Sequence, residues 1–207
     1  SVIEANGTDD QLAMLYTSLY HTMINPCVYM DVDGQYRGLD HNIHKADDFT
    51  NYTVFSVWDT YRTLHPLFNI INRRVNTDIA CSMLKHCEQS VHKALPIWSH
   101  MANENWCMIG YHSVSVLADA VAKGLPLDKE EVLKAMVSSS TIPYLDGTGE
   151  YMEKGYVALD HNGSAASLTL EYAYDDWTIY HTALLAGNRS VADIYKKRAA
   201  NYTNVFD

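Results

Sequence analysis

The sequence predicts a mainly α-helical protein of the α/α-toroid class, in which helical hairpins are arranged in a ring. Apolar residues recur at helical spacing along most of the 207 residues, whereas strand signals are few. A long apolar helix is followed by a shorter charged one three times, with the long helices beginning near residues 57, 110 and 165. Apolar helices belong inside and amphipathic helices outside. Three such pairs form about half of a six-pair ring, so we expect residues 1–207 to be part of a single (α/α)6 domain of a longer chain.

The individual elements follow from local signals taken in chain order. We expect helices over residues 11–24, 57–71, 76–92, 107–122 or 113–122, 128–139, 165–186 and 190–202. Asp33-Gly34 predicts a hairpin or tight turn. Ser56 and Ser164 stand where N-caps are favoured, and His65-Pro66 is expected to kink or divide the second helix. Residues 93–106 and 140–164 are predicted to be loops, the second because it contains Pro143, Gly147, Gly149 and Gly155.

Composition excludes several classes of protein. Fifteen Lys and Arg against 25 Asp and Glu give a net charge of −10, which argues against nucleic-acid binding. No apolar run reaches the roughly 20 residues that span a bilayer. The four cysteines contain no CxxC pair, so free thiols are favoured over a zinc site or two disulfides. Five N-x-S/T triplets would be glycosylation acceptors in a secreted eukaryotic protein, but such triplets also arise by chance in an Asn-rich chain.

Polar and aromatic residues gather at the three places where the chain enters a long helix. The clusters are Trp58 to Arg62, Asn103 to Trp106 continuing to Gly110–Ser113, and Asp160 to Ser164. An indole beside a carboxylate suits a sugar, because the ring covers a C–H face while the carboxylate accepts hydroxyl protons. These clusters therefore suggest a carbohydrate site at one end of the ring.

Each candidate also has a purely structural interpretation. Asp59 could instead stabilise a helix N-terminus and pair with Arg62. Glu104 could be a general acid, a hydroxyl acceptor or a solvated loop acid. His112 is more often a hydrogen-bonded helix histidine than a base. The adjacent Asp175 and Asp176 point about 100° apart on a helix, which favours capping or inter-helix hydrogen bonds over a catalytic pair.

Two apparent metal motifs lack the expected ligand pattern. His41, His44 and Asp48 match no known ligand spacing, and a solvated loop is favoured. The segment from Asp31 to Gly38 is similar to a calcium loop but lacks its terminal Glu, so a turn is favoured.

Several longer segments together resemble glycoside hydrolase family 92, the calcium-dependent exo-acting α-mannosidases. The strongest are residues 49–62, which read FTNYTVFSVWDTYR, together with 64–67, 107–113 and 170–177. Shorter matches cover residues 19–23 and 33–38. The matches are collinear over nearly the whole chain. The resemblance implies the first part of the family's catalytic (α/α)6 domain, with the family's β-sandwich preceding Ser1.

The resemblance also implies a mechanism. Family members invert the anomeric centre, with one carboxylic acid protonating the leaving oxygen and a carboxylate base activating water. Ca²⁺ binds the mannose hydroxyls and helps to distort the ring. The family's acid lies in a Glu-Gly-Asn-x-Trp-Gln segment and its base in an Asp-x-Gly-Gln segment, and neither string occurs here. Both residues are therefore expected beyond Asp207, in the remainder of the full-length protein.

This expectation leaves no catalytic residue or calcium ligand assigned within the 207 residues. Glu104 is the fallback acid if the family segment has been misplaced. Without the acid and the base, this piece alone is expected to be inactive.

The substrate contacts that the resemblance carries over are Trp58 as a pocket wall and Asp59 as a hydroxyl acceptor, with Glu104 and His112 as weaker candidates on the rim. The expected partners are mannose-containing glycans. The expected location is periplasmic or extracellular, and an unclosed ring would let the piece self-associate through exposed apolar surface. The alternatives are a non-catalytic carbohydrate-binding module and a structural helical-repeat domain.

Overall fold

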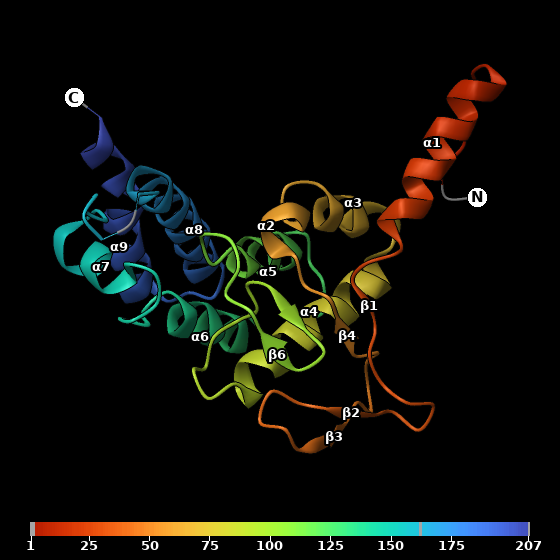
Figure 1. The fold of residues 1–207 in the computed structure, drawn as a ribbon, viewed down its shortest axis with the longest axis horizontal. Helices are drawn as coiled ribbons and strands as arrows, with labels where there is room; N and C mark the ends of the chain where they lie inside the picture. Colours follow the sequence, from red (N-terminus) through yellow and green to blue (C-terminus); the bar gives the residue numbers. More distant parts are fainter. Residues whose placement is uncertain (1–2, 162, 207) are drawn as a thin grey trace.

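Two rows of helices form the body of the protein (Figure 1), seen in a computed structural model that describes residues 3–161 and 163–206. In the first row, α3 (Leu64–Ile71), α5 (Ser113–Ala122) and α8 (Ala165–Leu185) pack side by side. In the second row, α4 (Arg73–Gln89) packs on α6 (Lys129–Ser139), and α9 (Arg189–Arg198) lies along α8. The pairs α3–α4, α5–α6 and α8–α9 are the repeated helical hairpins, and the mainly helical, α/α-toroid prediction is confirmed.

The other elements are short or peripheral. They are α1 (Asp9–Thr22), α2 (Val57–Thr60), α7 (Thr148–Lys154), the 3₁₀ helix η1 (Ala199–Val205), and the two-residue or three-residue strands β1 (Cys27–Val28), β2 (Gln35–Arg37), β3 (Ile43–Lys45), β4 (Tyr52–Thr53), β5 (Ser99–His100) and β6 (Asn103–Glu104). The strands form three antiparallel pairs, β1–β4, β2–β3 and β5–β6. In β2–β3 the buried Tyr36 stands opposite His44.

Helix α1 is stabilised by local capping and charge interactions rather than by packing against the body. Thr8 and Gln11 form a reciprocal capping box at its start, and two acids in the first turn suit the helix dipole. None of its residues is buried, and it projects away from the body (Figure 1). Met14 and Tyr20 are more than half exposed as a result.

The predicted helix over residues 57–71 is divided into α2 and α3, as His65-Pro66 indicated. Pro66 stands in the first turn of α3, where a missing N–H costs no helical hydrogen bond. The buried His65 bridges the break, with Nε2 3.0 Å from Thr60 Oγ1 and Nδ1 2.9 Å from Asn76 Oδ1. Burial lowers the pKa of His65 to about 4, so the ring is neutral at physiological pH.

The expected alternation of long first-row and shorter second-row helices is wrong for the first two pairs. Helix α4 has 17 residues, whereas α3 has 8 and α5 has 10. Pro66 shortens the run of α3, and positive φ angles at Trp106, Met108 and Gly110 keep the chain irregular until Ser113. Left-handed backbone cannot continue a right-handed helix, so the later of the two predicted starts of α5 is the observed one.

The predicted loop over residues 140–164 contains a helix, α7, which its high glycine content did not indicate. Gly147 and Gly155 flank α7 with φ angles of 79° and 78°. Residues in this left-handed region end or precede helices, and glycine adopts it without steric cost. The two glycines therefore delimit a helix instead of extending a loop.

The Asp-Gly signal marks a tight turn but not the hairpin connection. Gly34 N donates to Asp31 O over 2.9 Å, and Gly34 has a φ of 84°. The turn precedes β2, and the connection between β2 and β3 runs over residues 38–42. Asp128 caps α6, accepting from the N–H groups of Glu130 and Glu131.

The apolar core lies between the two rows of helices. Its fully buried members include Ile79, Met83, Val114, Leu117, Val132, Met136, Leu168 and Ile179, which come from α4, α5, α6 and α8. Among the described residues, no helix combines the length and apolar character that crossing a bilayer requires.

Truncating Leu168 tests how closely this core is packed. We expect Leu168→Ala to lower the free energy of unfolding by about 2–5 kcal/mol, because Leu168 is fully buried and its removal leaves a cavity. The measurement is urea denaturation of the chain. Leu170→Ala, on the same helix and 38% exposed, is the matched control and should cost less than half as much. Equal losses in the two variants would contradict the assignment of Leu168 to the core.

Candidate functional site

The predicted sugar-binding pair lies on the short helix α2. Asp59 is exposed, and its carboxylate accepts a very short hydrogen bond from Ser56 Oγ. Ser56 thus bonds to the Asp59 side chain instead of capping the backbone, in contrast to the expected N-cap. Trp58 is half-buried, and its buried indole N–H has no partner in hydrogen-bonding geometry among the described residues.

Arg62 joins α2 to α8 rather than pairing with Asp59. Its guanidinium lies over the Trp58 ring, 4.3 Å from the ring centroid, and Nη2 is 3.8 Å from Glu171 Oε1. In the described structure Arg62 forms no ion pair with Asp59, so the structural alternative for Asp59 lacks its salt bridge. A guanidinium over an indole face is favourable because the ring quadrupole is negative there.

His112 connects the second predicted cluster to α8. Its Nδ1 lies 2.7 Å from Asp175 Oδ1, and its Nε2 forms an ion pair with Glu171 Oε2 at 2.6 Å. Tyr61 stacks on the imidazole, with ring centroids 4.2 Å apart and an interplanar angle of 19°. The ring is therefore fixed from three sides.

The two carboxylates keep His112 charged. Burial alone would lower the pKa of His112, but Asp175 and Glu171 outweigh it and raise the pKa to about 9. Burial likewise favours the neutral form of Glu171, but His112, Arg62 and the nearby Trp58 indole together lower its pKa below the usual value. Glu171 is thus an anion beside Trp58, held in place by two cations.

Asp175 and Asp176 hold helices together, as the sequence favoured. Asp175 accepts from the backbone N–H of Tyr111 over 2.8 Å as well as from His112. Asp176 accepts from Tyr111 Oη, Tyr151 Oη and Arg198 Nε, all within 2.9 Å. Burial raises the pKa of Asp176 to about 6, although Arg198 opposes this. The pair links α8 to the residues before α5, to α7 and to α9.

The structure places Glu104 apart from this cluster, inside its own loop. One oxygen accepts from the N–H groups of Trp98 and Trp106, the other accepts from Ile97 N, and His86 Nε2 lies 3.6 Å away. The side chains of Glu104 and His86 are both about 95% buried. A buried carboxylate that accepts from three backbone N–H groups organises its own loop.

The predicted positions of the catalytic acid and base lie outside the described residues. Both were predicted to follow Asp207, and Asp207 itself lies outside the described residues. Within residues 3–161 and 163–206, the fallback acid Glu104 is buried among backbone donors. The substrate contacts expected of Trp58 and Asp59, and the positions of the acid and the base, stay predictions.

An open cavity of about 900 Å³ lies between α3, α5 and α8. Its lining residues are Tyr61, Arg62, Pro66, Ser115, Val116, Ala118, Asp119, Ala122, Tyr174, Trp177, Thr178, His181, Leu184 and Leu185. Trp58 and Asp59 are not among them, although Tyr61 and Arg62 of the same cluster are. Trp177, Leu184 and Leu185 are each about half exposed, so this surface of the first row is apolar and uncovered in the described chain.

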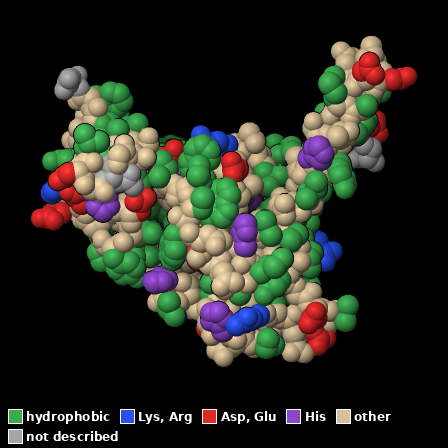
Figure 2. Space-filling view, viewed as in Figure 1, with side chains coloured by type: hydrophobic (Ala, Val, Ile, Leu, Met, Phe, Trp, Pro, Cys, Tyr) green, Lys and Arg blue, Asp and Glu red, His purple; other side chains and the backbone are tan. Residues whose placement is uncertain are grey.

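The remaining candidates form no metal site in the part of the chain that the structure describes. No group of three or more His, Cys, Asp or Glu in the described part of the chain could hold a metal ion, and His44 pairs with Asp40 at 2.9 Å. All four cysteines are free thiols, as favoured. The third cluster, from Asp160 to Ser164, includes Asn162, which lies outside the described residues. On the face in Figure 2, Lys and Arg side chains are few and form no patch.

Glu171 and Arg198 are the important residues that sequence reasoning left without a role. Glu171 and Asp175 are four residues apart on α8, so they share one face of the helix. That spacing would have indicated a cation between them. No comparable signal existed for Arg198, which reaches Asp176 only because α9 folds back along α8.

Comparison with known proteins identifies the family of the chain. The family model for the glycosyl hydrolase family 92 catalytic domain matches residues 1–207. The chain belongs to glycosyl hydrolase family 92. Comparison with curated protein sequences gave no match.

Two solved family 92 structures from Bacteroides thetaiotaomicron are similar to this family 92 chain. An α-mannosidase in complex with mannoimidazole shares 50% identity over 93% of the chain, with a TM-score of 0.90. An inverting mannosidase shares 34% identity over 100% of the chain, with a TM-score of 0.89. The chain spans 25% and 29% of their respective lengths.

Replacing His112 tests the buried ion cluster. At pH 7 we expect His112→Gln to lower the free energy of unfolding by about 3–5 kcal/mol, because it leaves two neighbouring carboxylates without their cation. The folded pKa of about 9 exceeds the unfolded value of 6.5. The protonated ring therefore stabilises the fold fully below pH 6.5 and ceases to do so as the pH rises through 9.

Denaturation between pH 6.5 and 9.5 measures this effect, and the difference between wild type and His112→Gln should shrink as the pH rises. His181→Gln, an exposed histidine on α8, is the control and should leave the pH profile of stability unchanged. A difference that is constant with pH would show that His112 is not held as an imidazolium.

Proposed function

We propose that the full-length protein is an exo-acting α-mannosidase that removes terminal mannose from glycans with inversion. The observation that carries this proposal is the 50% identity, over 93% of the chain, to a family 92 α-mannosidase solved with mannoimidazole. The inverting mannosidase that is 34% identical over the whole chain supports inversion. The acid and base would come from beyond Asp207, because the segments expected to carry them do not occur in this sequence.

Trp58 and Asp59 bind the terminal mannose in this proposal. Asp59 is exposed, and Ser56 orients its side chain. The carboxylate can therefore accept hydrogen bonds from two sugar hydroxyls. Trp58 provides an aromatic wall whose orientation is fixed by Arg62. Glu171 is an anion in contact with Arg62 and lies beside the indole, and it keeps this wall attached to α8.

His112 and Glu104 contribute indirectly. The two nitrogens of the His112 ring face the carboxylates of Glu171 and Asp175. The oxygens of Glu104 accept hydrogen bonds from backbone N–H groups. Both therefore act as positioning residues, one for the Glu171 side chain and one for the loop that carries Trp106. Glu104 is poorly placed to be the fallback acid, because a general acid must reach the leaving oxygen.

Calcium belongs to the proposal for the full-length protein only. The described residues contain no group of three acidic, histidine or cysteine side chains that fits a metal ion. Ca²⁺ takes six to eight oxygen ligands, so a site would need ligands from outside the described residues.

A periplasmic or extracellular location accompanies the proposal, because polymeric glycans are met there. We further propose that the chain by itself is inactive. We also propose that it self-associates through the apolar cavity surface that carries Trp177, Leu184 and Leu185.

Replacing Asp59 tests the proposed sugar contact. In the full-length protein we expect Asp59→Asn to lower kcat/KM for an aryl α-mannoside about 100-fold, because two charge-assisted hydrogen bonds are each worth roughly 1.5 kcal/mol or more. The melting temperature should change little, since the side chain is exposed. Asp193→Asn, exposed on α9, is the control with full activity. An active Asp59→Asn, or one that is merely unstable, would remove Asp59 from the sugar site.

Metal removal tests the calcium proposal. We expect dialysis of the full-length protein against a chelator to abolish turnover of the aryl mannoside, and added Ca²⁺ but not Mg²⁺ to restore it, since Mg²⁺ demands a smaller octahedral site. Full activity in the metal-free protein would contradict the proposal. Circular dichroism of the same samples separates loss of a catalytic ion from loss of folding.

A further inference from the structure

A second cavity, of about 460 Å³, lies among three connections of the chain. Its lining residues are His92, Ile97, Trp106, Met108, Gly110, Tyr144, Leu145, Asp146 and Tyr172. They come from the segment after α4, the segment before α5 and the segment before α7, with Tyr172 contributed by α8. The volume lies within the range of small-molecule sites.

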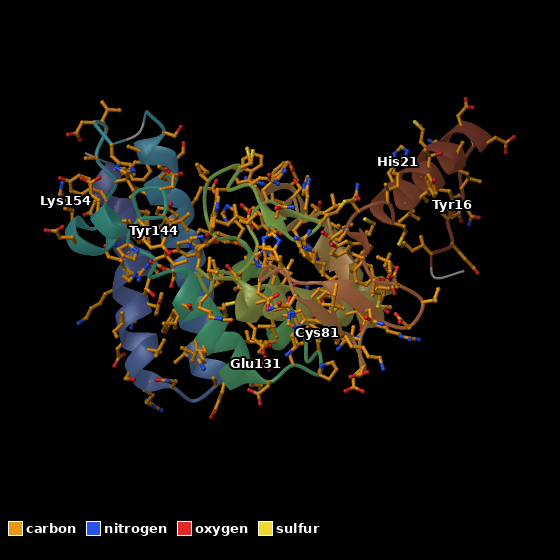
Figure 3. The ribbon with its side chains drawn as sticks, turned by 60° about the horizontal axis from the view of Figure 1, so that its bottom comes forward. Tyr16, His21, Cys81, Glu131, Tyr144 and Lys154 are labelled. Carbon is orange, nitrogen blue, oxygen red and sulfur yellow. The ribbon has the colours of Figure 1, made fainter. Side chains whose placement is uncertain are left out.

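Four aromatic rings, those of His92, Trp106, Tyr144 and Tyr172, contribute to the wall. His92 Nδ1 lies 2.8 Å from Tyr144 Oη, and the His92 and Trp106 rings meet edge to face at 5.2 Å and 82°. The buried Tyr172 closes the floor, donating to Asp146 O over 2.7 Å. Tyr144 is 68% exposed, so the rim is open to solvent. In Figure 3 Tyr144 lies on the body side of its segment, whereas Lys154 lies at the outer edge.

The wall is built at a cost in backbone strain. Trp106, Met108 and Asp146 have φ angles of +54°, +67° and +29°, where residues other than glycine are disfavoured. Left-handed residues of this kind are concentrated at functional sites, where surrounding contacts hold them. Here the three Glu104 hydrogen bonds, including one from Trp106 N, hold the Trp106 segment.

The cavity is joined to the segment that carries Trp58, because Ile97 in its wall accepts a hydrogen bond from the backbone N–H of Val57 over 3.2 Å. Gly110 in its wall is two residues before His112, and a Cβ on Gly110 would lie 2.5 Å from His112 Nε2. Tyr172 in its floor is next to Glu171 on α8 and stacks on Tyr111 at 5.0 Å. The turn from Gly110 to His112 therefore separates the aromatic cavity from the cluster that contains Trp58.

We infer that the cavity binds a second sugar ring of the glycan, with the pyranose face against Trp106 and with Tyr144 at the open rim; this inference rests on the proposed mannosidase function. Aromatic faces suit the C–H surface of a pyranose, while His92, Asp146 and Tyr144 supply polar atoms at the edges for hydroxyls. No Lys or Arg is among the lining residues, so the chemistry disfavours a phosphate or another anionic ligand. The ligand class is a neutral mannose oligosaccharide longer than the terminal residue.

Calorimetric binding to the full-length protein tests the inference with two probes. Methyl α-mannoside reports the terminal sugar alone, and a thio-linked α-mannobiose, which resists hydrolysis, reports both rings. We expect Trp106→Ala to weaken thio-mannobiose binding about tenfold and to leave methyl α-mannoside binding unchanged, because the indole face is the contact proposed for the second ring alone. Trp106→Phe should restore most of the loss, and Tyr144→Ala should reproduce part of it.

Val91→Ala is the control, because Val91 is 82% exposed on the same connection but outside the cavity. Melting temperatures of all variants separate lost binding from lost folding. If Trp106→Ala leaves both affinities unchanged, or weakens both equally, the second ring does not occupy this cavity while the proposed function stands. If wild-type protein binds neither probe and does not hydrolyse an aryl α-mannoside, the proposed function fails, and this inference fails with it.

Discussion

The protonated His112 between Asp175 and Glu171 is the constraint on which the candidate site depends. It joins the start of α5 to the middle of α8, two helices of the first row. A buried ion pair is favourable only when its remaining lone pairs and protons are satisfied. Asp175 meets that condition through Tyr111 N, and Glu171 meets it through Arg62. The orientation of the Trp58 indole therefore follows from a cluster buried one layer below it.

Helix α8 is the element that couples the parts of the molecule. Glu171 and Asp175 face α2 and α5, whereas Asp176 faces Tyr151 of α7 and Arg198 of α9. Adjacent residues on a helix point about 100° apart, so two successive aspartates can serve two different neighbours. This division explains why one helix carries several buried acids. Glu171 and Asp175 share His112, whereas Asp176 has a different set of donors, and together the three acids fix four segments that are distant in sequence.

The two cavities differ in what surrounds them. The larger one lies along the exposed apolar surface of α3, α5 and α8, and its lining comes from regular helices. The smaller one is enclosed by irregular segments whose backbone is strained and whose hydrogen bonds depend on Glu104. Strain of this kind persists only when surrounding contacts hold it. Glu104 thus contributes to the site through the loop that it organises, whereas the sequence predicts it as a direct contact of the sugar.

The sequence predicts part of the observed contacts. Residue type and position at helix entries predict Trp58 and Asp59 as substrate contacts, with His112 on the rim, and these roles stay predictions. The sequence also favours inter-helix hydrogen bonds of Asp175 and Asp176 over a catalytic role, and the structure confirms those bonds. The contact of Arg62 with Glu171 instead of Asp59 could not be foreseen, because it depends on how α2 lies on α8. The same holds for Glu104, whose three N–H partners are defined by the path of a strained loop.

The sequence by itself determined the helical class, most helix positions and the division at Pro66, because these depend on apolar spacing, caps and backbone restrictions that act over a few residues. Tertiary structure decided the helix lengths in the first two pairs, the presence of α7 between two glycines, and every partner of the buried acids. The reason is physical: local propensities act within one turn of helix, whereas the charge state of His112 and the closure of the aromatic cavity depend on groups more than 50 residues apart.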